Sequence, residues 1–376
     1  MSVVAIDTET TTFNKGNPYD CRNSLVCYSY ANASGGFAEL WDSDVNSAEF
    51  IQHLVDNNLV VGFNFKFDVA WLRKYGVTFS NAKIWDVQIA EFIISCQLNK
   101  FPSLDGTAVK YGLPTKPNRV KIEFWGQGID TKLIPWDILS EYAIHDAQST
   151  LACYYEQLKV MSPAQIKLCK LMSMDMLVLQ EMEQNGLIYN TELCEQRSKE
   201  MEDETEKLKQ GLAKFYPNIP INFNSGDDLS SFLYGGTVVE DIKIHDGFYK
   251  TGLKKGQPKL KNDTITHHLP QLFKPIKGSE LKKEGFYETN EGVLKKLTGK
   301  NKPVVAQLLA LARVEKINGT YYKGLRKLNE EMHWPLGKLH GQLNQTLAVS
   351  GRLSSSRPNT QNFSTDIQDI FISEYD

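Results

Sequence analysis

The chain has 376 residues, 41% of them hydrophobic, and a formal net charge of −3. This composition is typical of a globular protein of two or three domains and excludes an intrinsically disordered chain. No apolar run reaches the length of a bilayer span, and the N-terminus lacks the features of a signal peptide, so we expect a cytoplasmic protein. The six cysteines contain no Cys-x-x-Cys pair, which argues against a zinc knuckle or a disulfide framework.

Charge is distributed unevenly along the chain. Residues 1–150 and 151–240 have net charges of −5 and −6, whereas residues 241–302 carry 14 lysines against 7 acidic residues. An acidic front and a basic middle fit a protein that binds metal at one end and phosphate groups further along. A solvated insertion without a ligand is the alternative explanation for the lysines.

The first 160 residues alternate between short apolar runs and helical stretches. Apolar runs predict strands at residues 2–7, 25–31, 36–41 and 59–63. Helical periodicity predicts helices at residues 47–57, 66–76 and 136–160, and a short strand continuing into a helix at 84–95. This alternation predicts an α/β fold in which flanking helices cover a mixed sheet.

The pattern becomes mainly helical after about residue 160. Helices are predicted at residues 164–184, 191–215 and 304–332, the last with a break at Gly319. Residues 240–285 are rich in Lys, Gly and His and predict an inserted hairpin or long loop. We therefore predict three parts, at residues 1–160, 161–336 and 337–376.

Asp7 and Glu9 end the first predicted strand. Residues two apart on a strand point to the same face, so both carboxylates project together. Two like charges held together are costly unless a cation joins them. A polar strand end is the simpler explanation when the pair is considered alone.

Three further polar residues have the same character. Asp68 begins a predicted helix, where an acid also complements the helix dipole. Tyr142 and Asp146 lie four apart on another helix and share one face, where they can hold a water molecule between them. His145 lies on a different face, and we interpret it as structural or exposed.

Considered together, the four carboxylates Asp7, Glu9, Asp68 and Asp146 come from the ends of three elements of one α/β sheet. Carboxylate oxygens are preferred ligands of Mg²⁺. Two such ions about 4 Å apart clamp a phosphate, one activating water and the other stabilising the leaving oxygen. The sequence therefore predicts a site for two divalent metal ions, Mg²⁺ or Mn²⁺.

The strings DTET, NFKFD and YAIHD resemble the three motifs of the DnaQ-like exonucleases of the DEDD group. The Tyr-x-x-x-Asp spacing is that of the DEDDy branch; the DEDDh branch would need His where Glu141 stands. The resemblance implies a ribonuclease H-like fold and hydrolysis from a 3′ end that releases nucleoside monophosphates. It also implies that the four carboxylates bind the metals, that Tyr142 orients the attacking water and that Asn64 contacts DNA.

The second half of the chain resembles DNA polymerase I-like (family A) polymerases, most clearly in the string SGRLSSSRPNTQN at residues 350–362. Residues 179–190, 221–235 and 312–325 resemble neighbouring stretches of that family. The resemblance implies a thumb-like region that grips primer–template DNA. Its DNA-contact candidates are Lys316, Thr320, Arg352, Asn359, Gln361 and the lysines of residues 241–302.

Phage polymerases of this family are the most similar in pattern, which implies location in the host cell cytoplasm. By this resemblance residues 1–160 are a 3′–5′ exonuclease domain and residues 161–336 a helical, thumb-like region with the insertion 240–285. Residues 337–376 are the start of a polymerase palm. Because the chain ends at FISEYD, before the next family motif, we expect a split or truncated polymerase. A second chain would then supply the rest of the palm and fingers, and this chain alone would not synthesise DNA.

The function predicted from the sequence is a metal-dependent 3′–5′ DNA exonuclease that proofreads during DNA replication. One alternative is a DEDDy nuclease that trims RNA, which explains residues 1–160 but not residues 350–362. Another is a non-catalytic subunit that binds primer–template DNA. The insertion at residues 240–285 fits a partner-binding loop and a DNA clamp equally well.

Overall fold

The computed structural model describes residues 2–42, 46–115 and 119–373. The chain forms two compact units, one of Met1–Glu192 with Leu325–Asp376 and the other of Leu193–Gly324. These units are defined by packing, so they differ from the three parts predicted by sequence resemblance, which remain a prediction. No described helix is both long enough and apolar enough to cross a membrane.

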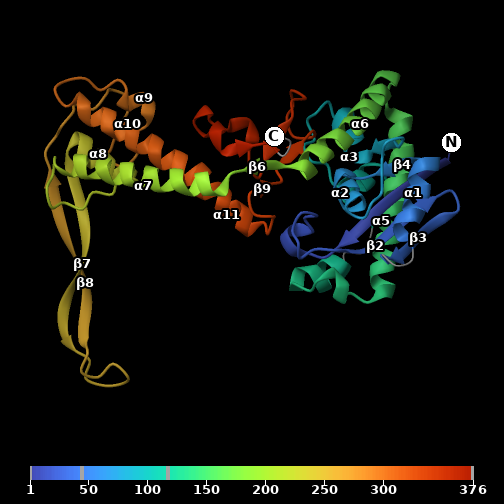
Figure 1. Cartoon of the computed structure of the whole chain (residues 1–376), viewed down its shortest axis with the longest axis horizontal. Coiled ribbons are helices and arrows are strands. Elements are labelled where there is room, and N and C mark those ends of the chain that lie inside the picture. The colour runs from blue at the N-terminus through green and yellow to red at the C-terminus, as the bar shows by residue number, and fades with distance from the viewer. Residues whose placement is uncertain (1, 43–45, 116–118, 374–376) are drawn as a thin grey trace. The chain divides into compact units, whose positions relative to one another are not determined.

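The first unit is built on a five-stranded sheet with the order β3-β2-β1-β4-β5 (Figure 1). Its strands are β1 (Ser2–Thr10), β2 (Leu25–Asn32), β3 (Gly35–Leu40), β4 (Asn58–Gly62) and β5 (Lys83–Asp86). The central strand β1 pairs antiparallel with β2 and parallel with β4, so the sheet is mixed, as the sequence predicts. This order places the strand that carries Asp7 and Glu9 between fixed neighbours.

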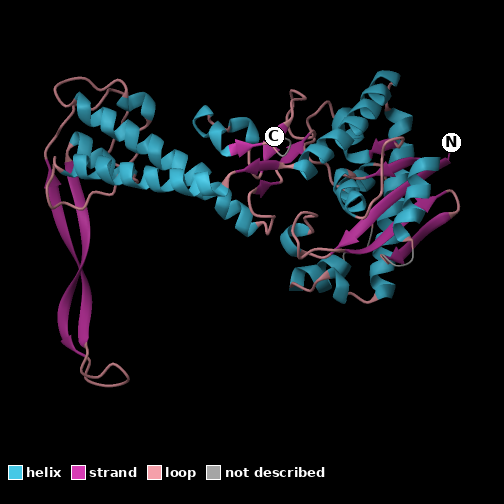
Figure 2. Ribbon diagram, viewed as in Figure 1, coloured by secondary structure: helices cyan, strands magenta, loops and turns pink. Residues whose placement is uncertain are grey.

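Helices cover this sheet, as Figure 2 shows. They are α1 (Ser47–Asn57), α2 (Lys66–Lys74), α3 (Val87–Ile94), α4 (Leu104–Lys110), α5 (Trp136–Val160) and α6 (Pro163–Asn185), with short helical turns at Phe13–Lys15, Val120–Phe124, Trp125–Gln127 and Thr131–Leu133. Helix α5 packs on β1, β2 and β3, whereas α6 packs on β5, α2 and α3. A capping box between Ser162 and Gln165 begins α6, with Pro163 in its first turn.

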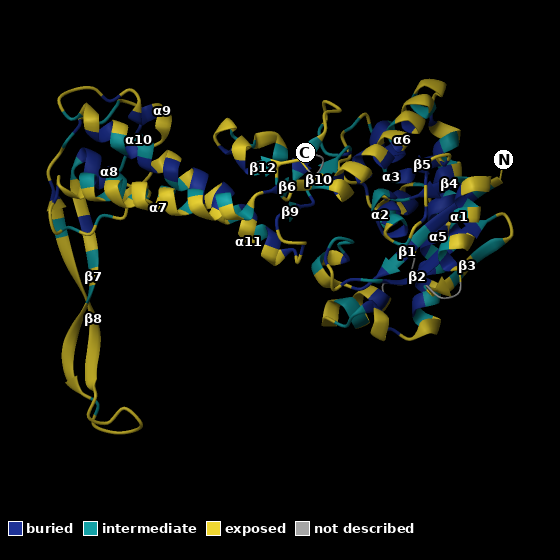
Figure 3. Ribbon diagram, in the orientation of Figure 1, coloured by how far each residue is buried: buried dark blue, intermediate teal, exposed yellow. Residues whose placement is uncertain are grey.

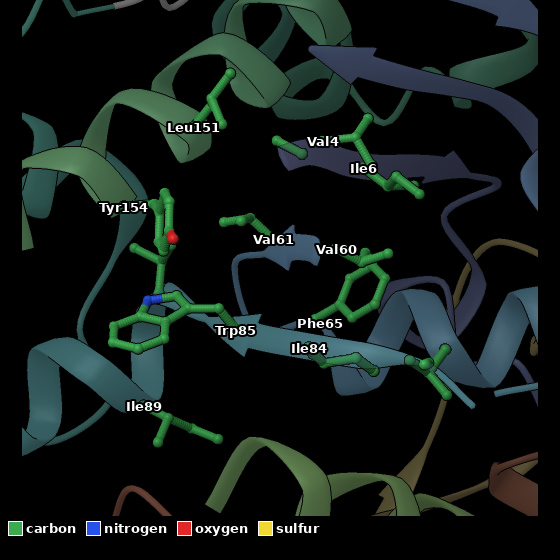
Figure 4. Packing of buried hydrophobic residues seen from close by; sticks show 14 of the residues in the cluster. Val4, Ile6, Val60, Val61, Phe65, Ile84, Trp85, Ile89, Leu151 and Tyr154 are labelled. Atoms are coloured by element: carbon green, nitrogen blue, oxygen red, sulfur yellow. The ribbon is translucent and has the colours of Figure 1, made fainter. Parts of the chain in front are cut away.

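The core of the first unit lies between these helices and the sheet (Figure 4). Its buried side chains include Val4, Ile6, Val60, Val61, Phe65, Ile84, Trp85, Ile89, Leu151 and Tyr154. Branched aliphatic residues favour strands because they pack well on a pleated surface. The core therefore fixes the strands whose ends carry the acidic residues.

A smaller sheet joins the end of α6 to the last part of the chain. Strand β6 (Leu187–Tyr189) lies between β9 (Lys338–Leu339) and β12 (Phe371–Ile372). Nearby in the sequence, β10 (Gln342–Asn344) pairs with β11 (Ser354–Ser356), and short turns follow at Thr360–Asn362 and Thr365–Ile370. This pairing explains why residues 325–376 belong to the first unit.

The second unit contains helices packed around a core of its own. The helices are α7 (Thr191–Ala213), α8 (Gly226–Tyr234), α9 (Glu291–Leu294) and α10 (Lys302–Ile317), followed by a π-helical turn at Asn318–Tyr322. The next helix, α11 (Lys323–Glu331), begins at the end of this unit and lies mostly in the first unit. Leu212, Phe232 and Leu308 are among the buried residues of this core. The π turn contains Gly319, where the sequence analysis places a break.

The inserted segment is a hairpin rather than a long loop over most of its length. Strands β7 (Gly236–Phe248) and β8 (Pro258–Leu269) pair antiparallel, with an irregularity in register between His245 and Phe248. Most of its residues are exposed, as Figure 3 shows. The hairpin makes a sheet of two strands only.

Candidate metal centre

Three of the four predicted carboxylates lie together in the first unit. Asp7 and Glu9 of β1 and Asp146 of α5 each offer an oxygen, and these oxygens all lie within 4.8 Å of one another. Asp146 is buried, and the other two are half-buried. Helix α5 packs on β1, which brings Asp146 to the strand face where residues 7 and 9 both point.

The arrangement suits a divalent cation. Three carboxylates this close repel one another unless positive charge lies between them. A set made only of oxygen donors matches the preference of Mg²⁺ and Mn²⁺, whereas zinc sites favour nitrogen and sulfur. Among the described residues, this is the group of acidic, histidine or cysteine side chains that could hold a metal ion.

Asp68 lies beside this group but is turned toward the main chain of β1. The Asp68 Oδ1 atom accepts a hydrogen bond from the Thr8 N–H at 2.9 Å and another from the Thr8 hydroxyl at 2.6 Å. Burial raises the pKa of Asp68, and the hydrogen bonds from Thr8 oppose that rise. Since Thr8 stands between Asp7 and Glu9, Asp68 is tied to the strand segment that presents both carboxylates.

Tyr142 is buried one turn before Asp146 on α5. Its ring meets the ring of Trp125 edge-on, with 5.4 Å between centroids. Burial raises the pKa of Tyr142, and the negative charges of Asp146, Glu9 and Asp7 raise it further. The phenol is therefore protonated at neutral pH and can donate a hydrogen bond next to the carboxylates.

Two other titratable residues near the site have structural explanations. The His145 Nδ1 atom lies 3.1 Å from the Ser149 hydroxyl on the same helix, in keeping with the structural interpretation of His145. Cys27 of β2 pairs with Glu9 across the sheet. Burial, with the charges of Glu9 and Asp7, raises the pKa of Cys27, so its thiol is protonated and a poor nucleophile.

The loop before Asp68 is held by Asp86, a residue that the sequence analysis did not identify. Asp86 caps α3 by accepting the N–H groups of Gln88 and Ile89, while its Oδ2 atom accepts the Phe65 N–H at 2.7 Å. Asn64, just before, adopts a left-handed conformation with φ of 53°. An acid between a buried strand and a helix is a recognisable N-cap signal, but its link to residue 65 is visible only in three dimensions.

The predicted DNA-contact residues are all exposed and come from both units. Asn64 lies in the turn before α2; Lys316 and Thr320 belong to the second unit; Arg352, Asn359 and Gln361 follow β10 in the first. The Gln361 side-chain amide donates to the Leu353 carbonyl at 3.1 Å. Their role in binding DNA stays a prediction.

Two known families match different parts of the chain, in the order in which the sequence motifs occur. Residues 1–161 match the family described as 3′-5′ exonuclease. Residues 263–375 match the family described as DNA polymerase family A. Residues 162–262, which include α7 and the first strand of the hairpin, lie outside both matches.

Curated relatives include two bacterial enzymes. The thermostable DNA polymerase I of Thermus filiformis is 31% identical over 185 residues, which are 49% of this chain and 17% of that protein. DNA polymerase I of Bacillus subtilis (strain 168) is 26% identical over 347 residues, which are 90% of this chain and 33% of that protein. The chain therefore spans a third or less of the length of these relatives.

A solved structure has a similar fold. The POL domain of Pol1 from M. smegmatis, in complex with DNA primer-template and dNTP, superposes with a TM-score of 0.67 at 19% sequence identity. The match covers 98% of this chain and 54% of that one. At this identity the similarity shows that the two folds are alike.

Proposed function

Because residues 1–161 match the 3′-5′ exonuclease family and residues 263–375 match DNA polymerase family A, we propose that residues 1–161 proofread DNA by removing nucleotides from a 3′ end. The observation that carries the proposal is the cluster of Asp7, Glu9 and Asp146 inside the matched segment, with ligand oxygens within 4.8 Å of one another. In a nuclease that no longer binds metal, three carboxylates at this distance would repel one another and destabilise the fold without serving catalysis.

In the proposed reaction, water attacks the last phosphodiester, forming a new P–O bond and breaking the bond to the 3′ oxygen. The 3′ oxygen takes up a proton, and a nucleoside 5′-monophosphate leaves. Asp7, Glu9 and Asp146 would hold divalent ions, with Asp68 completing a ribonuclease H-like ligand set. When bound, two Mg²⁺ or Mn²⁺ ions would lower the pKa of the attacking water and neutralise developing negative charge.

The chain's own residues have distinct tasks in this mechanism. Tyr142 would direct the water through its protonated hydroxyl. Asp68, bound to Thr8, holds the strand segment that presents the other carboxylates. The residues that would bind the DNA strand are Asn64, Lys316, Thr320, Arg352, Asn359 and Gln361, because Arg and Lys contact phosphates and polar side chains brace sugars and bases.

The two alternative functions differ from this proposal in what they leave unexplained. A DEDDy nuclease that trims RNA does not account for the match of residues 263–375 to DNA polymerase family A. A non-catalytic subunit for primer–template DNA does not account for the acidic cluster. Both remain outcomes of the experiment that follows.

The test is a gel assay of the purified chain on 5′-labelled single-stranded DNA, primer–template DNA and an RNA of the same sequence, with Mg²⁺. We expect stepwise shortening of DNA from its 3′ end and slower shortening of RNA. Faster cleavage of RNA than of DNA would favour the trimming nuclease. Binding of DNA without cleavage would favour the non-catalytic subunit.

A further inference from the structure

A buried ion pair joins the second exonuclease motif to the last part of the chain. The Lys66 Nζ atom donates to Glu183 Oε1 at 2.6 Å and to the Leu343 carbonyl oxygen at 2.5 Å. The Leu343 N–H donates to the same Glu183 oxygen at 2.6 Å. An ammonium, a carboxylate and both polar groups of one main-chain residue thus close a ring of hydrogen bonds.

This ring is shielded from water. The side chains of Lys66 and Glu183 are 19% and 7% exposed, respectively. Exposed ion pairs contribute little, but a buried charge that loses its partner is strongly destabilised. Each of the two residues therefore constrains the position of the other.

The ring connects three separate parts of the sequence. Lys66 lies in the segment that matches the exonuclease family, and Leu343 in the segment that matches the polymerase family. Glu183, near the end of α6, lies in neither.

Further contacts dock the segment around Leu343 on the same unit. The His340 Nδ1 atom lies 2.8 Å from the Glu183 carbonyl oxygen, and the His340 ring stacks on Tyr19 at 4.2 Å between centroids. The Gln345 side chain donates to the Met172 carbonyl oxygen at 3.0 Å. Residues 340–345 are thus attached to α6 at several points.

The ring reaches the acidic cluster through one turn of helix. Lys66 is the first residue of α2, and Asp68 lies in the same turn. The first turn of a helix has no intrahelical partners for its N–H groups, so outside contacts fix its position. At the start of α2, Asp86 holds the N-cap residue Phe65 through its N–H, and Glu183 holds Lys66 through its side-chain ammonium.

We propose that the ring of Lys66, Glu183 and the Leu343 main chain is a positioning device for the nuclease site. It makes the placement of Asp68, and of the Thr8 segment bound to Asp68, depend on the docking of residues 340–345. Lys66 and Glu183 are positioning residues, because they act through α2 and are not members of the acidic cluster. The proposal rests on the proposed nuclease function, because the site being positioned is that of the exonuclease.

The test compares the full chain with Lys66→Met, Glu183→Gln and Leu343→Pro variants, the last of which removes the main-chain N–H without touching an exonuclease residue. We expect kcat for shortening of single-stranded DNA to fall roughly tenfold to a hundredfold. That is the usual effect of losing a residue that orients a metal ligand without binding the metal itself. KM for DNA should stay within about twofold, since binding groups are untouched. Lys66→Arg, which keeps the charge, should recover most of the rate.

Lys110→Met is the matched control. Lys110 pairs with the buried carboxylate of Glu91, which joins α4 to α3 in the same unit and is not part of the acidic cluster. This variant should keep the wild-type kcat even if its melting temperature falls. An equal loss of kcat in the control would show that general destabilisation, and not positioning, explains the effect.

Hydrogen exchange at residues 64–69 gives a readout that does not need activity. The three ring variants should exchange faster there than wild type, and Lys110→Met should not. Faster exchange with unchanged kcat, a rise in KM alone, or unchanged exchange would each overturn the positioning role. An inactive wild-type chain would instead contradict the proposed function, and exchange alone would then decide whether the ring fixes α2.

Discussion

The five-stranded sheet of the first unit and the β7–β8 hairpin of the second use strands in opposite ways. Strand β1 has a neighbour on each side and α5 on one face, and Val4, Ala5 and Ile6 are at most 1% exposed. In β8 only Leu269 is fully buried. A two-stranded hairpin without a third strand or a packed face is marginally stable by itself.

The two regions can hold charged side chains in different ways because their backbones are fixed to different degrees. On β1 the surrounding core fixes the backbone, so Asp7 and Glu9 can be held close to Asp146 against their mutual repulsion. The hairpin instead carries six lysines against one aspartate between residues 243 and 261, all on exposed positions. A rigid sheet suits the orientation of reacting groups, whereas an exposed basic hairpin suits contact with phosphates.

The largest expected effect comes from the charges on the rigid sheet. Asp7→Ala and Asp146→Ala should each lower the rate of 3′-end cleavage by more than about a hundredfold, because each removes a predicted metal ligand. This loss is larger than the one expected when a residue that only supports a ligand is replaced. Single-turnover gel assays measure this. Without metal the variants should be at least as stable as wild type, since a repulsion is lost.

Asp137→Asn, an exposed change on the same helix as Asp146, is the control and should keep full activity. Cleavage at the wild-type rate in Asp7→Ala would remove the metal-centre interpretation. It would also mean that the rigid sheet does not hold Asp7 in position for catalysis.

The next largest effect is a difference in unfolding free energy between alanine substitutions in the sheet and in the hairpin. Ile84→Ala in β5, where the side chain is 2% exposed, should cost about 2–5 kcal/mol of unfolding free energy. Ile244→Ala in β7, at 38% exposed, should cost less than about 1 kcal/mol. Far-UV circular dichroism in urea measures both costs because it follows the helices and strands of both units. Tryptophan fluorescence reports the unfolding of the first unit alone, because all six tryptophans lie there.

The tryptophan transition should therefore move to lower urea in Ile84→Ala and stay in place in Ile244→Ala. Equal shifts in the two variants would mean that the hairpin shares the stability of the sheet. The contrast drawn from burial would then be wrong.

A smaller effect is expected from the phenol beside the carboxylates. Tyr142→Phe should slow cleavage by roughly tenfold, or about 1.4 kcal/mol in activation free energy, because the carboxylates that would hold the water-activating metal ions are kept. Its ring contact with Trp125 is retained, so the melting temperature should change little. A loss as large as that of Asp146→Ala would assign Tyr142 a more direct role than orientation.

The smallest effect concerns the hairpin. Replacing Lys250, Lys254 and Lys255 by alanine should weaken binding of single-stranded DNA a few-fold at low salt. The slope of the logarithm of the binding constant against the logarithm of the salt concentration should become less negative, by about 0.7 for each phosphate contact that is lost. Fluorescence anisotropy over a salt series measures both. Unchanged binding would assign the lysines to a solvated insertion or to a protein partner, and cleavage should be normal in either case.

Much of the site could be predicted because its signals are local. The spacing of Asp7 and Glu9 on a strand, and of Tyr142 and Asp146 on a helix, fixes which side chains share a face. The alternation of apolar and helical stretches likewise predicts the mixed sheet and its helices. The hairpin was predicted only as one of two options, because its alternation of apolar residues is weak.

What could not be predicted depends on contacts between distant residues. The hydrogen bonds from Thr8 to the Asp68 carboxylate were not predicted, because Thr8 is a residue of no evident chemical interest in the sequence. The role of Asp68 as a metal ligand stays a prediction. Lys66 and Glu183 are 117 positions apart, and Lys66 and Leu343 are 277 apart. No periodicity connects such positions, so only the folded chain reveals that they meet.

As proposed above, the acidic cluster of the first unit is a nuclease site that depends on divalent metal ions. The most direct test follows the shortening of 5′-labelled DNA by the wild-type chain in Mg²⁺, after addition of a chelator, and after Mg²⁺ is restored, with Asp146→Ala alongside. We predict shortening that stops with chelator, resumes with Mg²⁺ and is nearly absent from Asp146→Ala throughout. Shortening that persists in chelator, or that is equal in the two proteins, would show that the acidic cluster is not a metal-dependent nuclease site.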